Sequence, residues 1–414
     1  MDIREWADLY GEERVSAREF EAREAEERES EKRPPHLETI GRAGIDFDFA
    51  TLEQMRTAMS IPPVIAGALM PDAHLGYALP IGGVIALEGA VSPSFVGFDI
   101  GCSVHLTIFD GAMDLLLDLP AAADVLQRVT RFGVGAHFDE PHHDPVLDDP
   151  LWEIEPMRSL RGTALSQLGS SGAGNHFADI VFGEYRPGEE FVGLMTHSGS
   201  RGTGHKVASY FIDLAEKMNK LRGIPKGCEY LDLNSEPGNH YMVSMRLMDR
   251  YATACHKIIH NSFLKAMGIK AKSHIGQAHN LAWETLDGVV LHRKGATCAE
   301  YGVLGVIPGS CGSAAYIVQG LGDNRALQSA SHGAGRVASR SAAKRAFNPA
   351  LFEEQMKGIL HFGVAPDENP EAYKDIHRVV SQQVGLLVSI VGMMSPIVVV
   401  MGHGRPNPKS APNE

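Results

Sequence analysis

Residues 64–109 read VIAGALMPDAHLGYALPIGGVIALEGAVSPSFVGFDIGCSVHLTIF, and this stretch indicates the fold class. Short apolar runs alternate there with clusters of glycine and polar residues. Short apolar runs bounded by turn residues are typical of buried strands. We therefore predict strands in VIAGALM, IGGVIALEG, SFVGFDIG and VHLTIF, and a further strand in EFVGLMTH at residues 190–197.

The stretch from Gly204 to Met267 has a different pattern. Its segments HKVASYFIDLAEKMNKL and MVSMRLMDRYATACHKIIHNSFLKAM space their apolar residues as amphipathic helices do. Short strands resume in GVVLHRKGA and GVLGVIPGS. The sequence thus predicts one mixed α/β domain over residues 36–402, with central β-sheets flanked by helices and a helical insertion.

The two ends of the chain differ from this domain. Residues 5–33 are dense in Glu, Arg and Ala and end at Pro34 and Pro35. This pattern predicts a charged helical extension over residues 1–35, either solvated or contacting another copy. Its first residues have no apolar core, so they do not form a secretory signal. Residues 403–414 are predicted to form a C-terminal tail.

The formal net charge of the 414 residues is −13. A protein that coats nucleic acid normally has a basic face, so this charge argues against that class. Much of the acid lies in the first 35 residues, however, and bound metal ions would make a small groove locally positive. The five cysteines are scattered without a CxxC pair, which predicts a reducing cytoplasm rather than a disulfide framework.

The uncharged run from Val384 to Gly402 is about long enough to span a membrane. It contains Pro396, internal glycines and a β-branched second half. We therefore interpret it as a short helix followed by a buried strand, and we expect no membrane association.

Two polar clusters follow predicted strands in the opening stretch. Asp72 and His74 lie at a strand end, where functional sites often form, although Asp72 could equally cap a turn. Asp99 and Cys102 lie three residues apart around Gly101. A carboxylate and a thiolate placed together can bind Mn, Zn or Fe, whereas a lone Cys is more often a small buried apolar residue.

Two more clusters follow in LGSSGAGNHF and THSGSRGTGH. The first offers Asn175 and His176 after a glycine-rich loop that could present N–H groups to an anion. The second places His197 near Arg201, as in a metal ligand beside a phosphate clamp. A loop with a surface ion pair is the structural alternative.

The last cluster, SHGAGR, contains His332 between small residues, with Arg336 after it. A neutral imidazole can attack phosphorus, and nearby positive charge and N–H groups can stabilise the transition state. A helix N-terminus would explain the arginine but not the glycine-flanked histidine. His279 and the loop from Pro308 to Tyr316 add a further ligand and hydroxyl groups. Together the clusters indicate metal-assisted phosphoryl transfer.

At these clusters the chain resembles the RtcB family of RNA-splicing and RNA-repair ligases. PDAHLGYALPIGG, VGFDIGC, GNHF, HSGSRG, HN, PGSCG and SHGAGR occur in the family's order between Pro71 and Gly402. The resemblance implies an RtcB-type α/β fold. It implies a GTP- and Mn²⁺-dependent enzyme that joins RNA 3′-phosphate or 2′,3′-cyclic phosphate ends to 5′-hydroxyl ends, in tRNA splicing or RNA repair.

The resemblance also implies roles for individual residues. Cys102 would bridge two metal ions, Asp99 and His176 would complete one site, and His197 and His279 would complete the other. His332 would attack the GTP α-phosphate and form a histidine–GMP intermediate. The implied nucleotide contacts are Asn175, Asp179, Ser310, Gly333, Ala334, Gly335 and Tyr373, and the implied substrate-phosphate contacts are Arg201 and Arg336. No activating protein is indicated by the sequence.

Three positions depart from the family pattern. Asp179 stands where a glutamate usually pairs with the guanine edge, Met401 where a lysine contacts the base, and Cys311 where methionine is usual. These departures leave nucleotide selectivity open. A divergent paralogue with another nucleotide or substrate is therefore one alternative. A dinuclear metallohydrolase and a catalytically silent RNA-binding module are the others.

Overall fold

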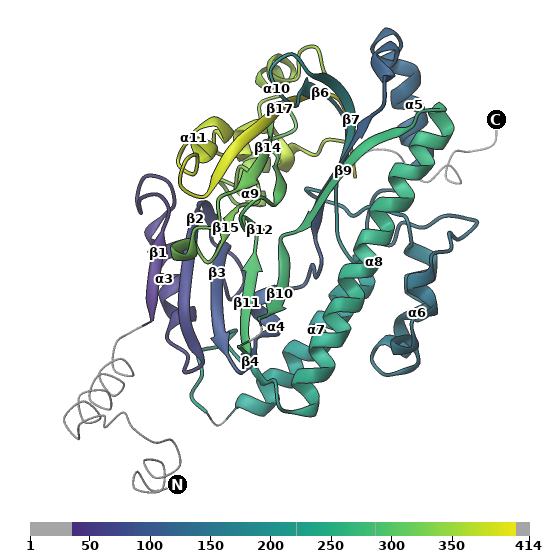
Figure 1. Cartoon of the computed structure of the whole chain (residues 1–414). Coiled ribbons are helices and arrows are strands. Elements are labelled where there is room, and N and C mark those ends of the chain that lie inside the picture. The colour runs from purple at the N-terminus through teal and green to yellow at the C-terminus, as the bar shows by residue number, and fades with distance from the viewer. Residues whose placement is uncertain (1–34, 221, 286, 403–414) are drawn as a thin grey trace, which may run out of the picture. The chain divides into compact units, whose positions relative to one another are not determined.

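The computed structural model describes residues 35–220, 222–285 and 287–402. The charged extension predicted before residue 35 and the tail predicted over residues 403–414 therefore lie outside the described residues. Within them, the predicted mixed α/β architecture is confirmed (Figure 1). A five-stranded sheet has the order β1 (His36–Thr39), β2 (Val64–His74), β3 (Ile81–Glu88), β11 (Val289–Lys294) and β10 (Asn280–Glu284).

An eight-stranded sheet carries most of the predicted site residues. Its order is β13 (Leu304–Ile307), β14 (Ala315–Gly320), β17 (Val388–Met401), β6 (Phe177–Glu184), β7 (Glu190–Ser198), β5 (Ser103–Phe109) and β9 (Ala271–Ala278), with β16 (Leu360–Phe362) paired to β17. Two small pairs complete the strands: β4 (Ala90–Val91) with β8 (Leu231–Asp232), and β12 (Ala296–Cys298) with β15 (Ser329–Ser331).

The helices lie outside the sheets, and the two longest of them confirm the helical pattern predicted from Gly204 to Met267. The helices are α3 (Phe49–Met59), α4 (Pro93–Val96), α5 (Leu119–Val129), α6 (Met157–Gln167), α7 (Arg201–Asn219), α8 (Glu236–Met267), α9 (Arg340–Ala346), α10 (Pro349–Gln355) and α11 (Ile376–Ser381). The long helix α8 begins at Ser235, whose hydroxyl accepts the Gly238 N–H, and ends at left-handed Gly268.

One predicted strand is wrong, and the prediction for the last apolar run is wrong in part. SFVGFDIG is not a strand, because Pro93 opens the short helix α4 and the segment from Asp99 to Cys102 forms a turn. The run from Val384 to Gly402 contains no helix. It is mainly the strand β17, and Pro396 is tolerated there because the register with β6 shifts at that point. Among the described residues, no helix is long and apolar enough to cross a membrane.

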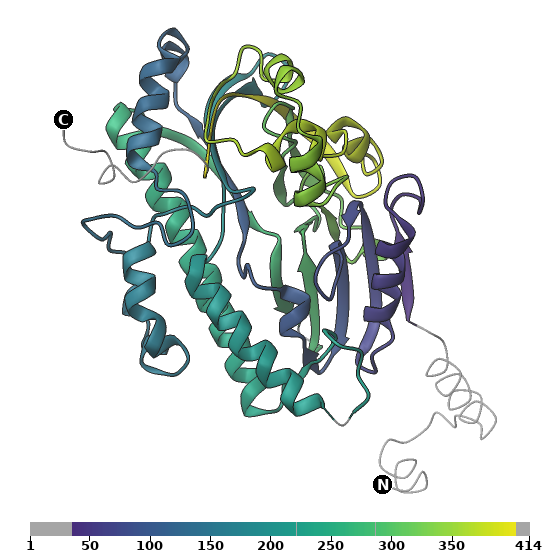
Figure 2. The same cartoon turned by 180° about the vertical axis from the view of Figure 1, so that it is seen from behind.

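The two sheets pack face to face through apolar side chains such as Val84 and Val318. Helix α3 covers the other face of the five-stranded sheet, and α5 and α8 cover the other face of the eight-stranded sheet (Figures 1 and 2). Side chains alternate along each strand. The eight-stranded sheet therefore has a helix side, which includes Ile180 and Leu194, and a cavity side, which includes Asp179, Met195 and His197.

Candidate active site

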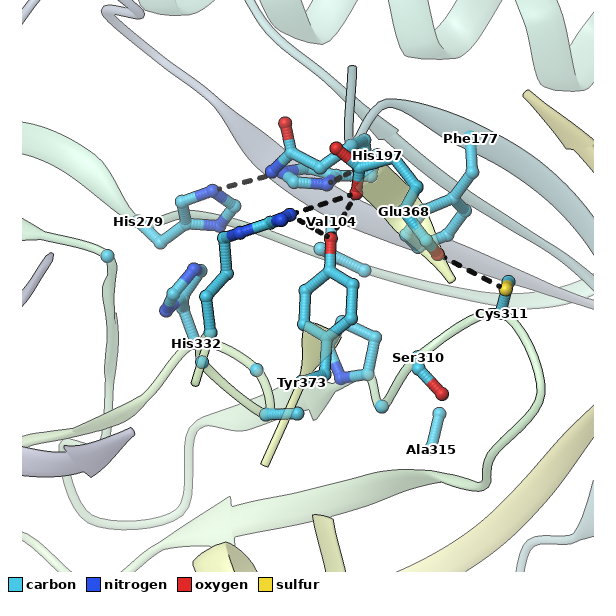
Figure 3. A pocket seen from close by; sticks show the side chains of 18 of the residues that line it. Val104, Phe177, His197, His279, Ser310, Cys311, Ala315, His332, Glu368 and Tyr373 are labelled. Carbon is cyan, nitrogen blue, oxygen red and sulfur yellow. Dashed lines mark hydrogen bonds and ion pairs between the residues drawn. The ribbon is translucent and has the colours of Figure 1, made fainter. Parts of the chain in front are cut away.

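A cavity of about 300 Å³ opens on the cavity side of the eight-stranded sheet (Figure 3). Its lining includes most of the residues predicted from the sequence: Asp99, Cys102, Asn175, Asp179, His197, His279, Ser310, His332, Gly333, Ala334, Gly335, Arg336 and Tyr373. Residues that lie up to 274 positions apart, from Asp99 to Tyr373, thus share one concave surface. Two predicted residues, His176 and Arg201, do not line it.

Three of the residues that line the cavity lie at the ends of three neighbouring strands. Cys102 directly precedes β5, His197 lies next to the end of β7, and His279 directly follows β9. Since β5 pairs with both other strands, these three residues meet at one end of the sheet. Gly101 shapes the approach: its φ is +71°, and a Cβ there would lie 2.8 Å from the Cα of Asp249.

The side chains of these strands converge on the Cys102 sulfur. Its Sγ lies 3.1 Å from Nε2 of His197 and 3.5 Å from Nε2 of His176. Nε2 of His197 lies 3.3 Å from Nε2 of His279, and Nε2 of His176 lies 3.1 Å from Oδ2 of Asp99. Two groups able to hold a metal result, Cys102–His197–His279 and Asp99–Cys102–His176, and both use the same sulfur.

Hydrogen bonds and burial leave lone pairs around Cys102 available to a cation. His197 Nδ1 donates to the carbonyl of Asn175 over 3.0 Å, which leaves its Nε2 lone pair facing the sulfur. Burial lowers the pKa of His197 to about 3, so the ring is neutral. Burial and the Asp99 carboxylate raise the pKa of the Cys102 thiol well above its usual range. A bound divalent ion would favour the thiolate and satisfy the converging lone pairs.

His332 lies beside this metal-binding group, with its ring centroid 4.8 Å from that of His279. Its Nδ1 donates to Oδ2 of Asp72 over 2.8 Å, and its backbone N–H donates to the same oxygen over 3.2 Å. Asp72 is fully buried. The loop fits closely because residue 335 is glycine: a Cβ at Gly335 would lie 2.0 Å from the Asp72 carbonyl oxygen. The pair fixes the ring with Nε2 free.

Tyr373 stands between the histidines and the opposite wall of the cavity, which carries Ser310 and Cys311 (Figure 3). Its hydroxyl donates to the buried carboxylate of Glu368. The Arg336 guanidinium lies over the Tyr373 ring, 5.1 Å from the centroid, and also contacts Glu368. Arg340 forms an ion pair with the other oxygen of Glu368. This network holds an aromatic ring in a fixed place in the middle of the cavity.

Comparison with known proteins decides the family. A family model described as tRNA-splicing ligase RtcB matches residues 54–149 and 156–402. The chain is 33% identical to RNA-splicing ligase RtcB1 of Escherichia coli, over 81% of this chain and 90% of that protein. The chain belongs to the RtcB family.

Relatives from other lineages agree. Identity is 31% to tRNA-splicing ligase RtcB of Thermococcus kodakarensis, over 85% of this chain and 91% of that protein. It is 32% to RNA-splicing ligase RtcB of Mycobacterium tuberculosis, over 84% of this chain and all of that protein. The resemblance read from the motifs is thereby confirmed, and the chain is an RNA ligase of the RtcB type.

The departures from the RtcB pattern gather at one end of the cavity. Asp179, Cys311 and Met401 all line it, and we call this region the Asp179 end. Asp179 is 4% exposed, its Oδ1 has no hydrogen-bond partner, and burial raises its pKa well above the usual range. We call the group Asp99, Cys102, His176, His197 and His279 the metal end.

The Arg201 side chain does not line the cavity, and hydrogen bonds to two loops hold it in place. At the start of α7, with φ +61°, its Nη2 donates to the carbonyl of Gly133 over 2.9 Å and its Nε donates to Ser170 Oγ over 3.2 Å. These bonds tie two loops together. The substrate-phosphate roles of Arg201 and Arg336 stay predictions.

Sequence reasoning missed Glu368 and left Asp72 undecided. Glu368 lies in a short polar turn, 32 residues from Arg336, with no local pattern to mark it. Asp72 had a signal, since it follows an apolar strand within a glycine-rich motif. Only the fold shows that its partner is His332, 260 residues away.

Proposed function

We propose that this RtcB-family ligase joins RNA 3′-phosphate or 2′,3′-cyclic phosphate ends to 5′-hydroxyl ends through a nucleotide bound covalently to His332. The observation that carries the proposal is the hydrogen bond from His332 to the buried Asp72 carboxylate, beside two possible metal-binding groups that share the Cys102 sulfur. An imidazole whose Nδ1–H is held by a carboxylate presents a lone pair at Nε2. That is the arrangement a nucleophile requires.

The first step would form a bond between His332 Nε2 and the α-phosphorus of a nucleoside triphosphate, while the bond to the pyrophosphate oxygen breaks and pyrophosphate leaves. The ring then carries positive charge, which the Asp72 carboxylate stabilises through the Nδ1–H bond of 2.8 Å. An oxygen of the RNA 3′-phosphate would next attack the nucleotide phosphorus, so that the bond to Nε2 breaks and the neutral imidazole is restored. A 2′,3′-cyclic phosphate end would first be hydrolysed by water to the 3′-phosphate. The 5′-hydroxyl oxygen would finally attack the phosphorus of the RNA 3′-phosphate and release the nucleoside monophosphate with loss of its proton.

We further propose that the metal end holds two Mn²⁺ ions. The donor set fits two cations: one sulfur belongs to both groups, one group adds a carboxylate and His176, and the other adds His197 and His279. Bound ions would supply Lewis-acid stabilisation of phosphate charge. Positive charge from ions also explains how a chain with net charge −13 can bind RNA ends and triphosphate.

The nucleotide would lie along the cavity from His332 toward the Asp179 end. Asn175, Ser310 and the Gly333–Ala334–Gly335 loop line the path and are proposed phosphate and sugar contacts. Tyr373 would stack on the base, held by Glu368 and Arg336. Asp179 would meet the edge of the base.

The Asp179 end favours one variation of this proposal, in which the nucleotide is not GTP. An ionised carboxylate accepts the two adjacent N–H groups of guanine, whereas a protonated one pairs with an adjacent donor and acceptor, as in adenine. Asp179 lies among Cys311, Met401 and other weakly polar side chains, where its neutral form is favoured. GTP and ATP therefore both require testing.

The experiment supplies Mn²⁺, one nucleotide, an RNA strand ending in a 3′-phosphate and an RNA strand beginning with a 5′-hydroxyl. The proposal predicts a joined product with GTP or ATP, and none from 3′-hydroxyl and 5′-phosphate strands. His332→Ala should remove the product, and His361→Ala, a histidine outside the cavity lining, should not. Phosphate release without joining, independent of nucleotide, would instead support the metallohydrolase alternative.

A further inference from the structure

A buried chain of histidines and hydroxyls runs along the helix side of the eight-stranded sheet, opposite the cavity. Helix α8 contributes His256 and His260, which are 0% and 3% exposed. Strands β5, β7 and β9 contribute the rest. We call the full set the polar seam: Ser103, His105, Thr107, Thr196, His256, His260 and His274.

Hydrogen bonds connect the buried part of the polar seam, from Ser103 to His260, without a gap. His256 Nε2 lies 3.1 Å from Ser103 Oγ and 3.2 Å from the Ser198 carbonyl oxygen. Its Nδ1 lies 2.6 Å from Thr196 Oγ1, and the same oxygen lies 2.7 Å from His260 Nε2. One threonine hydroxyl therefore joins two histidines of adjacent turns of α8.

The outer half continues to the sheet edge. Thr107 Oγ1 lies 2.6 Å from His260 Nδ1 and 2.9 Å from His274 Nδ1. His274 Nε2 in turn lies 3.0 Å from His105 Nδ1. His274 is exposed on β9, so the polar seam extends from solvent to the end of β7.

The direction of every bond follows from one acceptor. The Ser198 carbonyl can only accept, so His256 Nε2 carries the hydrogen and its Nδ1 accepts from Thr196. The Thr196 oxygen must then accept from His260 Nε2–H. With each ring neutral, all donors of the chain point the same way along it, toward the Ser198 carbonyl.

By the same logic, His260 Nδ1 accepts from the Thr107 hydroxyl, and Thr107 accepts from His274 Nδ1–H. His274 Nε2 accepts from His105. Burial holds the pKa of His105 and of His260 well below the usual range, in agreement with neutral rings. No ring in the chain needs a counter-charge.

The polar seam touches the strands that carry the metal ligands, next to the ligands themselves. Ser103 follows Cys102, and Ser198 follows His197. His274 lies on β9, which leads into His279. Because successive side chains point to opposite faces, the polar seam and the ligands occupy the two sides of the same strand ends. A shift of one strand against another would move both sets together.

We propose that the polar seam sets the spacing of Cys102, His197 and His279, with Thr196 and His256 as positioning residues of the metal end. The inference rests on the proposed metal site. Apolar side chains could fill the same space, but they would not fix the three strands in one register through directed bonds. Removal of hydrogen-bonding groups that orient metal ligands typically weakens metal binding about 10- to 100-fold.

The test titrates the metal-free protein with Co²⁺ and follows the visible and thiolate-to-metal absorption bands of this ion. A separate titration with Mn²⁺ measures the amount of bound ion. Thr196→Val keeps the side-chain shape and removes the central hydroxyl. It should weaken Co²⁺ binding about tenfold and alter the thiolate band. Thr107→Val, farther from the ligands, should cause a smaller loss, and Thr196→Ser should restore wild-type binding.

Thr203→Val is the matched control, since Thr203 is fully buried and its hydroxyl has no hydrogen-bond partner. Wild-type Co²⁺ affinity and spectrum in Thr196→Val would overturn the inference. So would equal losses in Thr196→Val and Thr107→Val that follow only their melting temperatures, because that result indicates packing alone. Absence of Co²⁺ and Mn²⁺ binding by the wild-type protein would instead remove the proposed metal site itself.

Discussion

The metal end and the Asp179 end of the cavity contain different kinds of side chains. At the metal end, side chains at the adjacent ends of β5, β7 and β9 converge, and the ligand atoms of each group lie within 4.8 Å of one another. At the Asp179 end, the Asp179 carboxyl lies near Cys311 and Met401, and one of its oxygens has no hydrogen-bond partner. The metal end brings together all the ligands that the family resemblance predicts, while the predicted departures from the family pattern lie at the Asp179 end. The chemistry is therefore more constrained than the choice of nucleotide.

The largest effect is expected at the shared sulfur. Cys102→Ala removes a ligand from both metal groups, so the protein should lose both ions, with affinity lower by at least about a hundredfold. Cys255→Ala, which alters another buried thiol, should retain them. Metal content after dialysis measures the difference. Two ions per chain in Cys102→Ala would show that the two groups do not depend on one sulfur.

The next effect separates the nucleophile from the metals. Asp72→Asn leaves the size of the side chain unchanged but removes the charge that accepts the His332 Nδ1–H. Covalent nucleotide transfer should fall about 10³- to 10⁴-fold, as when the carboxylate of a catalytic triad is replaced, while metal content stays the same. Single-turnover labelling measures the rate. An unchanged rate would remove Asp72 from the account of catalysis.

A smaller effect is expected at the Asp179 end. The double change Asp179→Glu and Met401→Lys restores the residues usual in the RtcB family, and it should raise GTP use relative to ATP use by about tenfold or more. Comparison of kcat/KM for the two nucleotides measures the shift. A double variant with the wild-type ratio would show that other residues of the cavity select the base.

The smallest expected effect concerns stability. Burial raises the folded-state pKa of Asp179 above the ordinary value of 3.8, so the folded protein keeps this proton to higher pH than the unfolded chain. Wild-type stability therefore falls as pH rises from 3.8 to that raised pKa. Asp179→Asn avoids this loss.

Its unfolding free energy should accordingly exceed that of the wild type by about 1 kcal/mol at neutral pH, with a smaller difference near pH 4. Urea unfolding at the two pH values measures both differences. A variant less stable than the wild type at neutral pH would mean that the carboxylate has a stabilising partner.

Much of the metal end could be predicted from the sequence, because its ligands lie in short glycine-rich motifs at strand ends. Asp99, Cys102 and His197 are examples, and the fold brings them together as expected. The helix α4 was missed because its apolar run is as short as the runs that form strands. A run of four residues has no measurable period.

Contacts between distant residues could not be predicted. Glu368 orients Tyr373 and Arg336 from a turn without a motif. His256 and His260 lie four residues apart on α8, and helical spacing indicates only that they share a face. Nothing in a single sequence shows that this face meets Thr196, 60 residues earlier. Such networks depend on strand register, which local patterns do not determine.

The most direct test of the central claim is to locate the covalent nucleotide. The Mn²⁺-loaded protein is incubated with GTP and, separately, with ATP, and the modified peptide is then identified by mass spectrometry. The account predicts one nucleoside monophosphate attached to His332 through an acid-labile phosphoramidate, absent from His332→Ala. Attachment to another residue, or full ligation by His332→Ala, would contradict it.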